Sequence, residues 1–221
     1  PIGFAGLAGL VYGLGLHSYI AYRATPLLFF VLFFTAKSYY DVASHRVGQL
    51  LIAAVFAFLV ALPLGSYFLA NPPDFFGRTD DISILKSSAP FRALGLNIVK
   101  TLGMFNFAGD TNWRHNYAGR PLLFWPVGLL FLAGAGVGLG GMINKIDKTD
   151  RTYKRACAVL LAWFAVAALP VILSNEGLPH ALRSVLMAPP VFILAGFGGI
   201  WFYEKIRKYP AVNFFSVMFV A

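Results

Sequence analysis

The sequence predicts an all-α protein, a polytopic bundle of transmembrane helices with about seven spans. Its composition is the first reason: 58% of the 221 residues are hydrophobic, 12% are charged, and the mean hydropathy is +0.70. Soluble domains contain about 45–50% apolar and about 25% charged residues. The second reason is that the apolar residues form separate runs, several of them near the ~20 residues needed to cross a ~30 Å hydrocarbon core.

Seven apolar runs are the predicted spans. They lie at about 1–14, 25–35, 47–66, 121–142, 156–173, 185–203 and 210 to the end. The first and last runs are cut short by the chain ends, and the second is short unless it includes Tyr19 to Arg23. Because the chain opens with Pro1 and has no signal-peptide pattern, we expect residues 1–221 to be an internal fragment of a transmembrane domain.

Basic residues predict the orientation of the spans. The net charge is +9, and many lysines and arginines gather in three short loops. These loops contain Lys37 and Arg46; Lys145, Lys148, Arg151, Lys154 and Arg155; and Lys205, Arg207 and Lys208. Alternating spans place all three loops on one face, which should be cytoplasmic. This clustering also argues against nucleic acid as a partner.

The opposite, external face carries the longest polar stretch, residues 67–120. Within it, Ser87 and Ser88 precede Pro90, and apolar residues follow at helical spacing. They are Phe91, Leu94, Ile98, Leu102 and Phe105. The pattern predicts an N-capped amphipathic helix lying in the membrane interface.

Glycines are concentrated between residues 134 and 141. They include a GxGxxG pattern, but no strand precedes it as a dinucleotide-binding unit requires. Close packing of helices is therefore the favoured interpretation. The single cysteine, Cys157, excludes a disulfide within the chain.

Three polar clusters near the external face are candidate binding sites, because polar groups at a membrane boundary are costly unless a partner compensates them. In the first, Tyr19 and Arg23 are one helical turn apart, and the arginine could hold a phosphate at headgroup depth. The alternative is an interfacial arginine among aromatic-belt tyrosines.

The second cluster spans residues 105–121. It combines Asp110, Trp113, Arg114, His115 and Tyr117, a mixture of donors, acceptors and aromatic faces that suits a sugar or a phosphate. The alternative is an ordered loop that caps the bundle, with Asp110 as a turn residue.

The third cluster spans residues 175–183, where Arg183 could neutralise an anionic headgroup or simply mark the interface. A metal site made of Glu176, His180 and His115 has no recognised spacing. We therefore expect no metal and no cofactor.

Several motifs together resemble the GT-C superfamily of membrane glycosyltransferases, in particular its family-39-like branch, which includes protein O-mannosyltransferases and the lipid A aminoarabinose transferase. The matching pieces are GLHSYxAYRxxP at residues 15–26, NPPDFFGR at 71–78, FNFxGDxNWRHNxxGRP at 105–121 and PHxxR at 179–183. They follow in the same order along nearly the whole chain.

The resemblance implies an enzyme that moves a sugar from a polyprenyl-phosphate-linked donor to an acceptor on the non-cytoplasmic face of the cell membrane. The general base of such enzymes lies in the first external loop, which would precede Pro1, so the catalytic residues are unknown here. Donor binding is expected from Arg23, Arg114 and Arg183, with Tyr19 and His115 as further donors. Trp113 and Tyr117 would hold the sugar or the acceptor.

Two other functions remain open at the level of sequence. A secondary transporter or lipid flippase also uses broken helices and interfacial charges, although no span interior holds an isolated ionisable residue. A non-catalytic membrane scaffold is the third interpretation. Membrane lipids are expected partners in every case.

Overall fold

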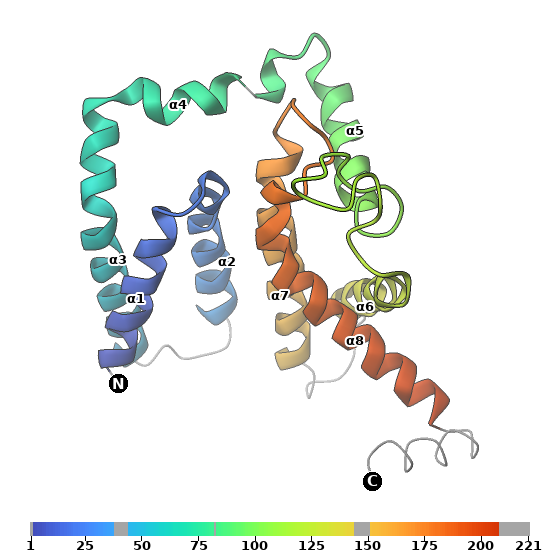
Figure 1. Ribbon diagram of the computed structural model, residues 1–221. Coiled ribbons are helices and arrows are strands. Elements are labelled where there is room, and N and C mark those ends of the chain that lie inside the picture. Colours follow the sequence, from blue (N-terminus) through green and yellow to red (C-terminus); the bar gives the residue numbers. More distant parts are fainter. Residues whose placement is uncertain (1, 38–43, 82, 144–150, 208–221) are drawn as a thin grey trace. The chain divides into compact units, whose positions relative to one another are not determined.

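The computed structural model describes residues 2–37, 44–81, 83–143 and 151–207, and the chain is helical throughout them apart from turns, loops and one isolated β-bridge between Ser83 and Ser174. The elements are α1 (Ile2–Leu16), η1 (Ile20–Ala24), α2 (Pro26–Lys37), α3 (Ser44–Ala70), α4 (Pro72–Asp81), η2 (Ile84–Lys86), α5 (Pro90–Gly103), α6 (Trp125–Ile143), α7 (Arg151–Ile172), η4 (Leu182–Met187) and α8 (Ala188–Ile206) (Figure 1). The all-α prediction is confirmed for this part of the chain.

Within the described residues, four helices are long and apolar enough to cross a membrane, at Gly48–Ala70, Trp125–Met142, Tyr153–Ile172 and Leu182–Ile206. They match four of the predicted spans. The predicted spans at 1–14 and 25–35 are also helical, but α1 has 15 residues and α2 has 12. At 1.5 Å per residue, neither reaches across a ~30 Å core by itself. The last predicted span, from 210 onward, lies outside the described residues, as do parts of the basic loops, so the count of seven is not confirmed.

The predicted external loop at 67–120 contains more helix than the sequence pattern suggested. The α3 helix continues to Ala70, and α4 follows it directly. Pro72 stands at the first position of α4, where a missing N–H costs nothing, and Asp74 lies in its first turn, where a negative charge is favoured. We did not expect α4, although its Asn-Pro-Pro-Asp start is a recognisable helix signal.

The amphipathic helix is confirmed as α5, with a correction to its cap. The Ser87 hydroxyl accepts a hydrogen bond from the Ala89 N–H at 3.4 Å, so it caps the turn before the helix. The first helical bond runs from the Ala93 N–H to the Ala89 carbonyl. Asn97 lies on the buried side and donates to the carbonyls of Ile172 and Ser174, 2.8 Å away in each case. Of the predicted apolar face, Phe91, Ile98 and Leu102 are exposed and Leu94 is partly exposed. Phe105, predicted on the same face, lies beyond the end of α5 at Gly103 and is buried.

The chain divides into two compact units, Pro1–Thr101 with Val166–Leu178, and Leu102–Ala165 with Pro179–Ala221. In the first unit α1 packs against α3, where Gly9 faces the backbone of Ala53. In the second unit α6 packs against α8 (Figure 1). At this contact Gly134 and Gly198 face each other's backbones. Gly141, farther along α6, faces the Tyr153 ring. The helix-packing interpretation of the glycine cluster is confirmed at Gly134 and Gly141.

Candidate functional site

A closed loop in the second unit carries the second predicted cluster. We call residues 104–123 the Asp110 loop. Its two ends are joined by backbone hydrogen bonds, from the Leu122 N–H to the Met104 carbonyl at 2.9 Å and from the Leu123 N–H to the Phe105 carbonyl at 3.1 Å. Met104 and Phe105 are buried, and the Phe105 ring centroid lies 5.5 Å from that of Phe131 in α6. The loop is therefore anchored on the apolar core of its unit.

Short-range hydrogen bonds fix the inside of the loop. The Gly119 N–H donates to the Asp110 carbonyl at 2.8 Å, and the Asn116 side-chain amide donates to the Arg120 carbonyl at 2.6 Å. A Cβ at Gly109 would collide with the Arg120 carbonyl oxygen, and Gly119 has a φ of 75°. Both positions therefore favour glycine.

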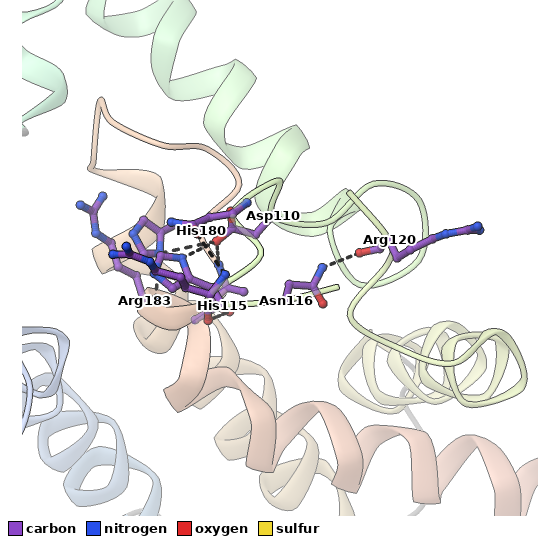
Figure 2. Close-up of polar contacts among 10 residues, drawn as sticks. Asp110, His115, Asn116, Arg120, His180 and Arg183 are labelled. Carbon is purple, nitrogen blue, oxygen red and sulfur yellow. Dashed lines mark hydrogen bonds and ion pairs between the residues drawn. The ribbon is translucent and has the colours of Figure 1, made fainter. Parts of the chain in front are cut away.

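The Asp110 carboxylate connects this loop to the segment that precedes α8 (Figure 2). Its Oδ1 accepts from the Asn112 N–H at 2.8 Å. Its Oδ2 bonds to Nδ1 of His115 and to the N–H of Ala181, both at 2.9 Å, and Ala181 is 71 residues farther along the chain. Only 4% of Asp110 is exposed. The carboxylate thus brings the second and third predicted clusters together.

A second histidine completes this group. The His180 ring stacks on the His115 ring with centroids 4.7 Å apart and planes 20° from parallel. Its Nδ1 lies 3.9 Å from Oδ2 of Asp110. We call Asp110, His115 and His180 the His–Asp cluster.

The charge state of Asp110 follows from its surroundings. Burial by itself raises the pKa of this carboxyl. The hydrogen bonds from the Asn112 and Ala181 amides and from His115 outweigh burial and hold the pKa of Asp110 below its usual value. Asp110 is therefore ionised at neutral pH.

The outer side of the Asp110 loop presents three other predicted residues. Trp113 and Tyr117 are 77% and 79% exposed, and Arg114 is exposed beside them. Cζ of Arg114 lies 5.8 Å from the centroid of the Trp113 ring. The Arg114 N–H donates to Oδ1 of Asn112 at 3.1 Å, which fixes the backbone at this point. The loop thus offers a guanidinium and two aromatic faces outward while its acidic residue is turned inward.

Arg183 lies inside the unit. It is 6% exposed, in η4 at the start of the span Leu182–Ile206, and its N–H donates to Nδ1 of His180 at 3.4 Å. A buried guanidinium needs compensating partners. Arg183 is thus buried next to the His–Asp cluster and is not an exposed interfacial arginine.

The first predicted cluster belongs to the other compact unit. The Arg23 guanidinium lies 4.7 Å from the ring centroid of Phe68 and 4.6 Å from that of Phe75, and it donates to the Phe75 carbonyl at 3.3 Å. Tyr19 stands directly before η1. Arg23 therefore ties η1 to the corner between α3 and α4. That Arg23 lies at one donor site together with Arg114 and Arg183 stays a prediction.

The position of His180 beside Asp110 was not predicted. The sequence places His180 in the third polar cluster and in a candidate metal site with Glu176 and His115. The pairing depends on a contact between two loops that are separated by α6 and α7, and no spacing rule reports such a contact. The one available signal was that both loops were independently rich in polar residues.

No protein-family model, curated protein or solved structure matches this chain significantly.

Proposed function

We propose that this protein is a membrane glycosyltransferase with about seven spans, which moves a sugar from a polyprenyl-phosphate-linked donor to an acceptor on the non-cytoplasmic face of the cell membrane. The observation that carries the proposal is the outer side of the Asp110 loop, where Trp113, Arg114 and Tyr117 are all exposed and the Arg114 guanidinium lies beside the Trp113 ring. Such a surface has the chemistry that a phosphate-linked sugar needs.

Each group has a distinct part in the proposed reaction. Attack at the anomeric carbon expels a lipid phosphate, so negative charge develops on the leaving oxygen. The Arg114 guanidinium can bind this phosphate by two parallel hydrogen bonds and stabilise that charge. Trp113 and Tyr117 offer flat apolar faces on which a sugar ring can stack.

The buried residues of the Asp110 loop hold its backbone in place. Asp110 is fully engaged by backbone and histidine donors, so in this proposal it positions the loop and is not the general base. The loop ends beside α6, whose segment Trp125–Met142 is apolar enough to cross a membrane. A binding surface next to the start of a span suits a donor whose lipid tail stays in the bilayer.

Replacing Arg114 tests the proposal. We expect Arg114→Ala to lower kcat/KM for transfer from a polyprenyl-phosphate sugar by about 100-fold, the effect of removing a group that stabilises developing charge. Arg114→Lys should recover part of the rate, because it restores the charge but not the paired hydrogen bonds. The measurement is sugar transfer by the complete natural protein in proteoliposomes, with a panel of labelled donors.

Arg120 provides the matched control. It is exposed in the same loop, but its side chain extends away from the His–Asp cluster (Figure 2). Arg120→Ala should transfer sugar at close to the wild-type rate. Equal rates for Arg114→Ala and wild type would remove Arg114 from the site, and absence of transfer from every polyprenyl-phosphate sugar would reject the proposed function.

A further inference from the structure

The His–Asp cluster has the composition and spacing of a metal site. The cluster places one nitrogen from each histidine and one carboxylate oxygen within 4.8 Å of one another. Oδ2 of Asp110 is 2.9 Å from Nδ1 of His115 and 3.9 Å from Nδ1 of His180. Tetrahedral zinc with bonds of about 2.0–2.2 Å sets neighbouring ligand atoms about 3.4 Å apart. These two distances lie on either side of this value. Because the in-plane lone pairs of stacked rings run nearly parallel, the two histidine rings must rotate out of their stack for both nitrogens to face one ion.

The geometry at His180 points the same way. Its Nδ1 lies 3.9 Å from Oδ2 of Asp110, which is too far for a hydrogen bond and is a separation that one ion between the two atoms can bridge. Metal binding would replace the hydrogen bond that this nitrogen accepts from the Arg183 N–H at 3.4 Å. His115 needs only to move its proton from Nδ1 to Nε2 to offer a second nitrogen.

The ligand set indicates which cation fits. Two imidazoles and one carboxylate suit zinc and similar transition metals, whereas Mg²⁺ and Ca²⁺ prefer oxygen ligands. The groups are mostly buried, and the Ala181 N–H donates to the carboxylate from outside the cluster, as hydrogen-bond donors that orient metal ligands do.

We propose that Asp110, His115 and His180 bind one zinc-class ion that joins the Asp110 loop to the segment before α8. Three protein ligands leave a fourth position for a water molecule or an anionic oxygen. The sequence predicts no metal, because Glu176, His180 and His115 have no recognised metal-ligand spacing. This inference does not depend on sugar transfer.

Zinc titration of the detergent-solubilised full chain tests the site. After treatment with EDTA, the wild type should bind one equivalent of Zn²⁺ in competition with a chromophoric chelator and should ignore Mg²⁺ and Ca²⁺. Co²⁺ should bind at the same place and give the visible absorption of a four-coordinate nitrogen and oxygen site. This spectrum needs no variant and is therefore independent of any folding defect.

Asparagine variants separate a metal site from a hydrogen-bond network. In His115→Asn the amide nitrogen can still donate to Asp110, and in His180→Asn the amide oxygen can still accept from Arg183, but neither side chain is a good zinc ligand. Each should weaken zinc binding by more than the ~10–100-fold that is lost when only a hydrogen-bond partner of a ligand is removed. His17→Asn is the control, because His17 lies in the other unit and bonds to the Val60 carbonyl.

The outcomes decide between the two interpretations. A stoichiometric site that is lost in both cluster variants and kept in His17→Asn supports the proposal. Wild-type affinity in His115→Asn and His180→Asn places the zinc elsewhere and overturns it. Failure of the wild type to bind Zn²⁺ or Co²⁺ also overturns it and leaves a hydrogen-bond network alone.

Discussion

Asp110→Ala is expected to lower the free energy of unfolding by about 3 kcal/mol, measured without metal in EDTA. The substitution removes an ionised acceptor and leaves the Asn112 and Ala181 amides and the His115 ring without their partner. Buried donors that lose their acceptor cost about 1–3 kcal/mol each, and their effects are not additive. Unfolding by SDS in mixed micelles, followed by tryptophan fluorescence, measures the change.

Asp74→Ala is the matched control for this experiment. Asp74 is also an aspartate of the region 67–120, but it is exposed and accepts one hydrogen bond, from the Tyr67 hydroxyl. Its removal should leave the stability close to that of wild type. If Asp110→Ala were no more destabilising than Asp74→Ala, Asp110 would not join the two loops.

Gly198→Ala is expected to destabilise the α6–α8 contact by about 1–3 kcal/mol, the usual cost of overpacking. A Cβ at Gly198 would collide with the Leu130 carbonyl oxygen and would lie 2.8 Å from the Gly134 nitrogen. These are backbone atoms, so the helices must move apart to admit it. The same SDS titration measures the effect.

Gly196→Ala separates this collision from the change in helix propensity. Gly196 lies in the same helix, two residues earlier, and a Cβ there meets nothing within 4 Å. It should leave stability unchanged or raise it slightly, because alanine favours the helix over glycine. Equal stability of the two variants would contradict the close approach of α6 and α8.

The spans and the packing glycines could be predicted from sequence because each depends on local composition. A run such as 121–142 is long and apolar enough to indicate a span whatever its neighbours are, and α6 covers most of it. The runs at 1–14 and 25–35 were ambiguous, since their lengths lie below a full crossing. The polar composition of residues 72–81 predicts a loop where α4 forms, although Pro72 and Asp74 mark a helix start.

The site was predictable only in part, because it depends on contacts between loops as well as on local composition. Its two loops could be identified because their aromatic and polar residues are clustered in sequence. The direction of each side chain could not be predicted. The sequence therefore groups Asp110 and His115 with Trp113 and Tyr117, whereas in the structure Asp110 and His115 point inward and Trp113 and Tyr117 are exposed. His180 joins Asp110 through a contact across 70 residues of chain, which only the folded structure reveals.

Photo-crosslinking at position 113 tests most directly whether the outer side of the Asp110 loop binds the lipid-linked donor. Benzoylphenylalanine in place of Trp113 keeps an exposed aromatic side chain, and the same label in place of the exposed Phe4 of α1 reports contact with bulk lipid. We expect a radiolabelled polyprenyl-phosphate sugar to crosslink at position 113 and unlabelled polyprenyl phosphate to compete it away, with no such competition at position 4. Equal and uncompeted labelling at the two positions would contradict donor binding by this loop.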